Sequence, residues 1–507
     1  MKSFPIIYVL ITLLASILPA NAEPFANRSD RNAVTKASHL PSTVGEDNLL
    51  WRVPLKGGDF MNTITIYDGK VYCIVEGAAA PNIELGRREN VLLVFDARTG
   101  EILVEKGYSG LGGGYDAHAP LIEGDRLYTR TDGDHFICLN RHTGEVIWEN
   151  NPVEQMGMKI QRCHGPNGNA IIIGDYYYVP TCATGLEWTP RIDELSQEWP
   201  WVPKIVAMNK YTGDIVAMDE LEQEHFYHGQ WSSVSTGKVN GQQVIFYGDG
   251  NGIVHAFKAE DTYPERVGNG DVHRLKHLWS MDANPPEYRF WENGLPRSYQ
   301  TDWDGVRDIP EGNGRDIGPC EIIGDPVFKD GLLYVALARD YEYCNKRGAR
   351  AFGQGGIMCI DPDGGGDLTK PTLVWRNLDL NRTFSTPSVT DDGLIFIADL
   401  AGQINCFDAV TGERLWDHDI KSKSWNYGQI VADGKVFVQN STGDLYILGA
   451  TREKKVFYEG ELNGKNGPMC GVADGILVVA TGNEVAAYGD PDVVKGPGSS
   501  NTVADLR

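Results

Sequence analysis

One short sequence recurs along this chain, and it constrains the fold more than any other feature. Residues 94–101 read VFDARTGE and residues 406–413 read CFDAVTGE, with weaker copies at residues 139–145 and 208–214. In each copy an apolar segment leads into Asp or Asn, then Thr-Gly, and a second apolar segment follows. The polar side chain of such a turn bonds the local backbone, and the glycine accepts the positive φ that the turn requires. Each copy therefore predicts two antiparallel strands joined by a tight turn.

A second pattern precedes the first in each unit. It consists of an apolar segment, Asp-Gly and a β-branched or aromatic segment, as in residues 66–72, 328–334 and 431–437. Together the two patterns give four antiparallel strands, A to D, in one meander. The units begin near Thr63, Ala119, Ala170, Ser232, Ile323, Ser385, Gly428 and Met469. Repeats at this spacing predict an all-β fold, an eight-bladed β-propeller of four-stranded antiparallel blades.

The two ends of the repeat array explain how the ring closes. The last unit, residues 469–488, lacks a D strand, whereas residues 49–55 form an isolated one. We therefore expect the N-terminal strand to complete the last blade, which leaves no open edge. Tryptophan recurs at one position of the D strands, and such a repeated ring suits packing between neighbouring blades. We assign this structural docking role to Trp51, Trp148, Trp279, Trp375 and Trp416.

These motifs resemble those of the PQQ-like family, the quinoprotein alcohol dehydrogenase-like superfamily of eight-bladed propellers. Its D strands carry Asp-x-x-Thr-Gly-x-x-x-Trp, which residues 408–416 match in full. The copy at Asp96 has Val104 in place of the tryptophan, and the copy at Asn140 keeps Trp148. The resemblance covers residues 47–489 and includes bacterial periplasmic and outer-membrane-assembly propellers. It implies the fold more specifically than an activity.

The N-terminus has the features of an export signal. Lys2 precedes an apolar run at residues 6–18, and Ala20-Asn21-Ala22 reads as a cleavage site. No later segment is apolar enough to cross a bilayer. We therefore expect a signal peptide at residues 1–22, a flexible segment at 23–46, the propeller at 47–489 and a disordered tail at 490–507. This places the mature protein in the periplasm or outside the cell.

The nine cysteines fall into core positions and loop-rich segments. Cys138, Cys359 and Cys406 occupy equivalent positions in three repeats and are expected in the core. Cys163 with Cys182, and Cys320 with Cys344, are possible bridges within loop-rich segments. An odd number of cysteines leaves at least one of them without an intramolecular partner.

The topology of a meander separates two faces of the ring. A–B and C–D turns form one face, here called the turn face, and B–C hairpins with D-to-A connectors form the other, the loop face. The long insertions, residues 77–90, 183–203, 339–355 and 283–322, all belong to the loop face. We therefore expect a ligand or partner site there. The candidate ligand-binding residues are His118, His164, His228, Trp188, Arg289, Trp291, Trp303 and Arg307.

Each candidate also has a structural interpretation. The aromatic rings can bury the loops against the blades, and the three histidines can cap connectors instead of binding a ligand. Because no carboxylate partner can be placed beside them, we predict no metal site. No residue is assigned a catalytic role.

Three functions compete. The sequence favours a secreted or periplasmic binding or scaffold propeller, monomeric, with a protein, small-molecule or carbohydrate partner. The first alternative is a quinone-dependent dehydrogenase, but many alcohol dehydrogenases of that group carry two adjacent cysteines, and no Cys-Cys pair occurs here. Motifs therefore give no support to PQQ or calcium as cofactors. The second alternative is a carbohydrate-binding or -processing propeller. A net charge of −23 disfavours nucleic acid as a partner.

Overall fold

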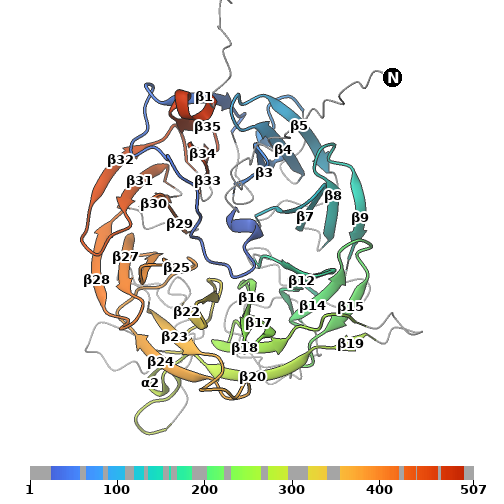
Figure 1. Ribbon diagram of the computed structural model, residues 1–507, viewed down its shortest axis with the longest axis vertical. Helices are drawn as coiled ribbons and strands as arrows, with labels where there is room; N and C mark the ends of the chain where they lie inside the picture. The colour runs from blue at the N-terminus through green and yellow to red at the C-terminus, as the bar shows by residue number, and fades with distance from the viewer. Residues whose placement is uncertain are drawn as a thin grey trace, which may run out of the picture.

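The chain forms eight antiparallel blades around a central axis (Figure 1), which confirms the predicted fold class. A computed structural model describes residues 24–57, 64–83, 89–108, 119–130, 135–151, 159–160, 168–184, 203–221, 230–263, 272–294, 318–339, 354–421, 428–440, 442–465 and 470–495. In blades 1 to 7 the four meander strands follow one another in sequence from the axis outwards, and in blade 8 the outermost strand comes from the N-terminus. Strand A is therefore innermost and strand D outermost.

Blades 1 to 4 contain the first half of the strands. Blade 1 is β2 (Thr65–Tyr67), β3 (Lys70–Glu76), β4 (Asn90–Asp96) and β5 (Ile102–Tyr108). Blade 2 is β6 (Leu121–Glu123), β7 (Arg126–Arg130), β8 (Phe136–Asn140) and β9 (Val146–Asn150). Blade 3 is β11 (Ile171–Ile173), β12 (Tyr176–Pro180), β14 (Ile205–Asn209) and β15 (Ile215–Met218). Blade 4 is β16 (Val234–Val239), β17 (Gln242–Gly248), β18 (Ile253–Lys258) and β20 (Lys276–Asp282).

Blades 5 to 8 repeat the arrangement. Blade 5 is β21 (Val327–Lys329), β22 (Leu332–Ala338), β23 (Gly355–Asp361) and β24 (Thr372–Asn377). Blade 6 is β25 (Ser388–Val389), β26 (Leu394–Ala398), β27 (Gln403–Asp408) and β28 (Arg414–Asp419). Blade 7 is β29 (Gln429–Ala432), β30 (Lys435–Gln439), β31 (Asp444–Gly449) and β32 (Val456–Glu461). Blade 8 is β33 (Gly471–Ala473), β34 (Ile476–Thr481), β35 (Glu484–Gly489) and β1 (Leu49–Pro54).

The remaining elements are short. They are the 3-10 helices η1 (Phe25–Asn27) and η2 (Gly77–Ala79), the strand pair β10 (Lys159–Ile160) and β13 (Ala183–Thr184), β19 (His273–Arg274), and the helices α2 (Pro286–Arg289) and α3 (Pro491–Lys495). Within the described ranges, the chain has no helix with both the length and the apolar character needed to span a membrane.

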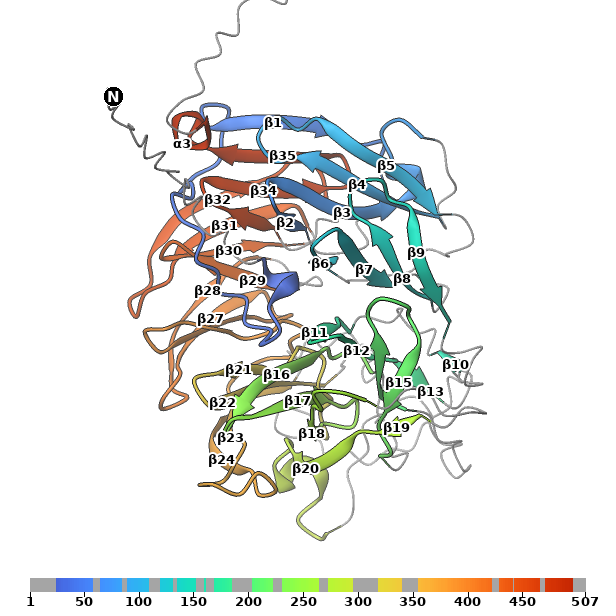
Figure 2. The same cartoon turned by 45° about the vertical axis from the view of Figure 1, so that its right-hand side comes forward.

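Ring closure follows the sequence prediction. The N-terminal strand β1 pairs antiparallel with β35, with Trp51 opposite Ala487 and Pro54 opposite Glu484. The two ends of the repeat array therefore share one blade, and Figure 2 shows β1 lying beside β35. Closure by hydrogen bonds between distant segments removes the open edge of the last blade.

Apolar side chains fill the spaces between neighbouring blades. One buried cluster joins blades 3 and 4 through Tyr178, Ala217 and Phe257, and another joins blades 8 and 1 through Trp51 and Phe95. Similar clusters occupy the other six junctions. The core is thus a ring of contacts between neighbouring blades. Each B and C strand lies between two other blades, so the side chains on both of its faces are apolar.

Tryptophan of strand D contacts the C–D turn of the next blade. The Nε1–H of Trp148 donates to the carbonyl of Lys210 at 2.9 Å, and that of Trp416 donates to the carbonyl of Thr451 at 2.9 Å. Trp51, Trp279 and Trp375 donate in the same way to Ala97, Pro362 and Ala409. Each indole therefore joins two blades by packing and by one hydrogen bond.

The glycine of the Thr-Gly turn makes this contact possible. A Cβ atom on Gly213 would lie 2.6 Å from the ring of Trp148, and one on Gly412 would lie 2.4 Å from Trp375. Both glycines also have positive φ, 79° and 72°. The repeat thus uses glycine for two reasons, the turn conformation and the approach of the neighbouring tryptophan.

Two of the three blades without the tryptophan use other contacts. In blade 1 the hydroxyl of Tyr108 donates to the carbonyl of Gly144 in the next blade at 2.7 Å. In blade 3, Ala217 stands at the tryptophan position, and β19 pairs parallel with β15 there. This added strand comes from the C–D segment of blade 4.

Residues on both sides of the repeat array pack against the ring. Residues 24–48 cross the blades, where Arg31, Asn32 and Leu40 are buried. Residues 491–495 form α3, and Val494 packs into the cluster between blades 8 and 1. These buried side chains find partners on the finished ring, which local sequence composition does not reveal. The expected domain bounds, with a flexible segment at 23–46 and a disordered tail at 490–507, stay predictions.

The cysteine positions agree with a core role in three blades. Cys138, Cys359 and Cys406 are fully buried and lie opposite Trp148, Trp375 and Trp416 in the strand pairing. The two suggested bridges include Cys163 and Cys344, which lie outside the described residues. Those bridges remain predictions.

Candidate functional site

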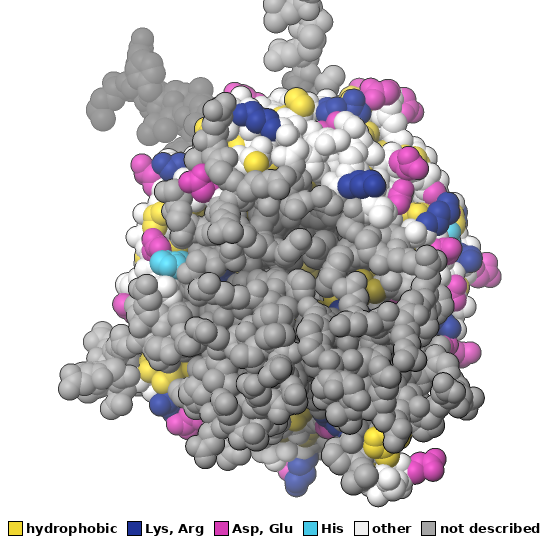
Figure 3. Space-filling model, turned by 180° about the vertical axis from the view of Figure 1, so that it is seen from behind, with side chains coloured by type: hydrophobic (Ala, Val, Ile, Leu, Met, Phe, Trp, Pro, Cys, Tyr) yellow, Lys and Arg dark blue, Asp and Glu magenta, His cyan; other side chains and the backbone are white. Residues whose placement is uncertain are grey.

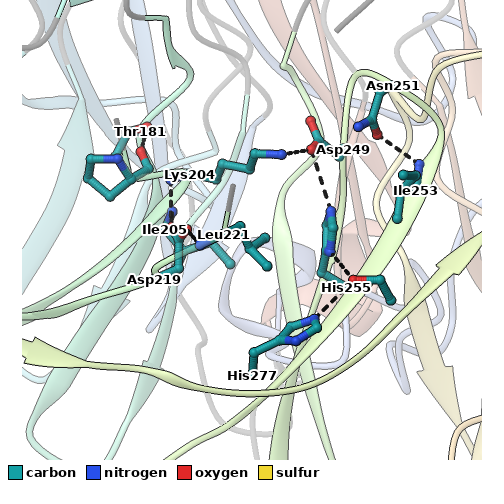
Figure 4. Close-up of polar contacts among 12 residues, drawn as sticks. Thr181, Lys204, Ile205, Asp219, Leu221, Asp249, Asn251, Ile253, His255 and His277 are labelled. Carbon is teal, nitrogen blue, oxygen red and sulfur yellow. Dashed lines mark hydrogen bonds and ion pairs between the residues drawn. The ribbon is translucent and has the colours of Figure 1, made fainter. Parts of the chain in front are cut away.

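Buried polar side chains gather between blades 3 and 4, at the loop-face end of the middle strands B and C. Lys204 directly precedes β14 of blade 3, and Asp249 directly follows β17 of blade 4. Their ion pair joins the lysine Nζ to the Asp249 Oδ2, and both side chains are almost inaccessible, 2% and 1% exposed. Figure 4 shows the two side chains meeting across the blade boundary. A buried charge pair of this kind is costly unless the remaining polar atoms are also bonded.

The turn that contains Asp249 differs from its counterpart in blade 6. There the carboxylate of Asp399 accepts the backbone N–H groups of Ala401 and Gln403, so it stabilises its own turn. In blade 4, Asn251 takes over this role by accepting the N–H of Ile253 at 3.0 Å. Asp249 is thereby available to bond across the blade boundary, and its Oδ1 has no hydrogen-bond partner among the described residues.

A row of hydrogen-bonding side chains leads outwards from Asp249. The His255 Nε2 lies 3.5 Å from Asp249 Oδ2, and its Nδ1 lies 2.8 Å from the Ser280 hydroxyl. The same hydroxyl lies 3.0 Å from Nε2 of the exposed His277. These residues come from β18 and β20, so one blade positions the whole row (Figure 4). The row connects a buried ion pair with the outer surface of the ring.

The ionisation of the cluster follows from burial and charge. Burial favours the neutral acid of Asp249, but the Lys204 charge and His255 together outweigh it and lower the pKa of Asp249 to about 2. Burial also lowers the pKa of His255, against the effect of the Asp249 carboxylate. Asp249 is therefore a carboxylate, and His255 a neutral imidazole, at neutral pH.

A second carboxylate fixes the lysine backbone. The Asp219 Oδ2 accepts the N–H groups of Lys204 and Ile205 at 2.6 and 2.7 Å, and its Oδ1 accepts the N–H of Leu221. Burial raises the pKa of Asp219 to about 6, although these N–H groups lower it. Asp219 thus holds the start of β14 and the position from which Lys204 extends.

This arrangement can bind a polar group, because it offers a buried carboxylate oxygen beside a cation. The row from Asp249 to His277 also links this buried carboxylate with the outer surface through an imidazole and a hydroxyl group. Among the residues that the structure describes, no group of three or more His, Cys, Asp or Glu side chains has the arrangement of a metal site.

Two of the residues chosen from the sequence, Arg289 and Trp291, lie in the described part of the loop face. Arg289 forms two hydrogen bonds with the Asp282 carboxylate, at 2.8 and 2.6 Å, and a third with the carbonyl of Asn251. It therefore anchors α2 to the B–C turn of blade 4. Trp291, two residues later, is half-buried. His118, His164, His228, Trp188, Trp303 and Arg307 lie outside the described residues, so their proposed roles stay untested.

Sequence reasoning missed Lys204, Asp249 and His255. Asp249 begins an Asp-Gly-Asn-Gly turn, which reads as ordinary turn chemistry. One signal was His255 itself, because it places an imidazole at the C-strand position where blade 6 has the uncharged Asn405. Only the packing of blade 3 on blade 4 brings Lys204 to this carboxylate.

The surface around the loop-face rim is electrostatically mixed. Figure 3 views the molecule from the side opposite Figure 1, and basic and acidic side chains of the described residues are interspersed around its rim. The net charge of −23 is therefore not gathered into one acidic patch on the part of the rim seen there.

The sequence repeats and docking contacts match those of a known family. The family described as outer membrane protein assembly factor BamB matches residues 87–162 and 353–488, a little under half of the chain. The matched parts carry three copies of the turn motif and the tryptophans Trp148, Trp375 and Trp416 that dock onto neighbouring blades. These two parts of the chain are similar to PQQ-like repeats, and the whole chain has the fold of a β-propeller.

Solved structures share the architecture of this propeller. BamB from Moraxella catarrhalis is 14% identical with a TM-score of 0.52, over 87% of this chain and 100% of that one. Quinohemoprotein alcohol dehydrogenase from Comamonas testosteroni is 12% identical with a TM-score of 0.45, over 96% of this chain and 82% of that one. The likeness to BamB concerns the fold alone. A comparison with curated protein sequences gives no match.

Proposed function

We propose that this propeller is a scaffold outside the cytoplasm that binds a partner protein on its loop face. A signal peptide at residues 1–22 would direct the export. The family that matches part of the chain is described as an outer membrane protein assembly factor. That description supports a protein partner over a small molecule or a carbohydrate.

One observation carries the choice of face. The axial end of the turn face is already covered by the chain's own N-terminal segment, which bonds to the A–B turn residues Asp433 and Gly475. On the loop face, by contrast, the long insertions of the B–C hairpins and D-to-A connectors are concentrated. Long loops on a rigid scaffold are the usual carriers of binding sites.

Photo-crosslinking from two matched positions tests this proposal. Phe290 follows α2 on the loop face and is 49% exposed, and Tyr211 lies in a C–D turn on the turn face and is 47% exposed. Each is replaced by p-benzoylphenylalanine in cells that make the protein. We expect a covalent adduct with another envelope protein from position 290 and none from position 211. Adducts from position 211 alone, or from neither position, would contradict the loop-face proposal.

A separate titration distinguishes the dehydrogenase alternative. The purified protein is heated with pyrroloquinoline quinone and calcium, and its melting temperature is compared with that of the protein alone. A scaffold should show no saturable rise. A rise that depends on both additives, together with quinone-dependent dye reduction by an alcohol or a sugar, would overturn the preference for binding.

A further inference from the structure

The N-terminal segment crosses the axial opening of the turn face, as the blue chain in the centre of Figure 1 shows. The A strands around this opening are edge strands, because no strand pairs with their inner side. Such an edge exposes backbone N–H and C=O groups that need partners when buried. The segment supplies these partners blade by blade.

Backbone groups of the segment bond directly to four blades. The N–H of Thr236 in blade 4 donates to Ser29 at 2.8 Å, and that of Phe328 in blade 5 donates to Asp30 at 3.1 Å. Val431 in blade 7 makes a two-sided contact, since its N–H donates to Ala33 and its carbonyl accepts from Thr35. The N–H of Gly475 in blade 8 donates to Ser38 at 2.8 Å.

Two asparagine side chains act as short substitutes for a strand. The Asn27 amide donates to the carbonyl of Ile122 in blade 2 at 2.6 Å and accepts its N–H at 3.0 Å. The Asn32 amide bonds in the same way to Val389 in blade 6, at 2.8 and 2.9 Å. A primary amide carries one acceptor and two donors, so it can satisfy both backbone groups of one residue.

Arg31 completes the series at the centre. Its side chain is fully buried, and its guanidinium donates to Ala170 in blade 3 and to Val234 in blade 4. A third bond goes to Ala26 within the segment. Because a buried guanidinium is costly without such partners, its position depends on the finished arrangement of blades 3 and 4.

We propose that residues 25–38 form an axial strap, a second closure of the ring that acts independently of β1. The strap joins seven of the eight blades, blades 2 to 8, whereas β1 closes only blade 8. Its binding surface exists only when all seven blades are in place, so the strap docks after the ring has formed, although it precedes every blade in the chain. Opening the ring then requires release of both β1 and the strap, which slows unfolding.

A peptide experiment tests whether the strap binds a preformed surface. Residues 24–40 are deleted from the full chain, and a fluorescent peptide of the same residues is added back. We expect saturable binding by fluorescence anisotropy, and weaker binding when the peptide carries Arg31→Ala and Asn32→Ala. The control peptide carries Arg28→Ala, since the Arg28 guanidinium forms its ion pair with Asp30 of the strap itself. It should bind as the parent peptide does.

Point variants of the full chain cover the case in which the deletion does not fold. Arg31→Ala with Asn32→Ala should unfold at least about tenfold faster in denaturant, because the lost contacts are absent once the ring opens. Hydrogen exchange of the Thr236 and Val431 amides should become faster as well. Arg28→Ala should leave both rates unchanged. Equal unfolding rates and equal amide protection in the double variant, or no peptide binding by a folded deletion variant, would overturn the proposal.

Discussion

At the scale of single residues, the indole of strand D does two things that a phenyl ring cannot do together. It fills the space against the glycine of the next turn, and its Nε1–H bonds the carbonyl three residues before that glycine, as Trp148 does with Lys210 and Gly213. Packing and hydrogen bonding therefore contribute separately to the contact between two blades.

Substitutions at Trp148 should separate these two contributions. Trp148→Ala is expected to reduce the free energy of unfolding by about 3–5 kcal/mol, as for other buried aromatic truncations, and Trp416→Ala should behave alike. Trp148→Phe should cost only about 1–3 kcal/mol, mainly because the carbonyl of Lys210 loses its donor. Chemical denaturation measures all three. The exposed neighbour Val146, changed to Ala, is the control, and a near-zero effect of Trp148→Ala would show that the docking contact is not structural.

The Lys204–Asp249 pair should behave as a unit. Asp249→Ala leaves a buried ammonium without its counter-charge and should cost about 3–5 kcal/mol. Lys204→Met alone should also destabilise, because it leaves the carboxylate unpaired. The double variant Lys204→Met with Asp249→Leu should be clearly more stable than either single variant, since no buried charge remains. A double-mutant cycle by denaturation gives the coupling, and additive effects would argue against a buried ion pair.

Asp219 should make stability depend on pH in the slightly acidic range. Its pKa is raised to about 6 in the folded protein, so its contribution is fully present below the unfolded pKa and is lost as the pH rises through about 6. The loss is on the order of 3 kcal/mol for a shift of about two units. Asp219→Asn removes this dependence. The difference in unfolding free energy between parent and variant should therefore shrink from pH 4 to pH 7, whereas a constant difference would exclude titration of this group.

At the scale of elements, three blades use a strand or a contact that departs from the regular repeat. Blade 8 takes β1 from the N-terminus, and blade 3 takes β19 from the C–D segment of blade 4. Blade 1 has Val104 at the tryptophan position, and Tyr108, four residues further along the same strand, makes the hydrogen bond to the next blade instead. The repeats are therefore similar in backbone and different in how they contact their neighbours.

Removal of β1 should expose the edge of β35. A variant lacking residues 47–56 is expected to aggregate, because six residues of β35 lose their outer partner and offer an edge to other molecules. Light scattering and size-exclusion chromatography measure the effect. The same length removed from the C-terminal residues 496–507 serves as a control and should leave the protein monomeric. A monomeric β1 deletion would show that closure by this strand is dispensable.

At the scale of the whole molecule, the net charge of −23 opposes compaction. Added salt screens this repulsion, so the melting temperature should rise between about 10 and 150 mM salt, over which the Debye length falls from about 30 to 8 Å. NaCl and KCl should act alike, because screening depends on ionic strength and not on the identity of the ion. A falling melting temperature would show instead that attractive ion pairs dominate.

The sequence alone determined the blade count, the strand order and the closure by residues 49–55. These features depend on local sequence. A tight turn needs Asp or Asn with Gly at fixed positions, and the apolar segments between turns need a neighbouring sheet on each face. The position of tryptophan relative to the Thr-Gly turn is local as well.

Tertiary structure decided the rest. The strap of residues 25–38 gives no signal in the sequence, because its backbone, two asparagines and Arg31 together bond to seven blades that are distant in sequence. Lys204 and Asp249 meet only because blade 3 packs on blade 4, and an isolated Asp-Gly-Asn-Gly turn gives no sign of a partner in another blade. Long-range pairing of polar groups has no period along the chain, whereas turns and strands do, and this is why the ring could be read from the sequence and its buried polar contacts could not.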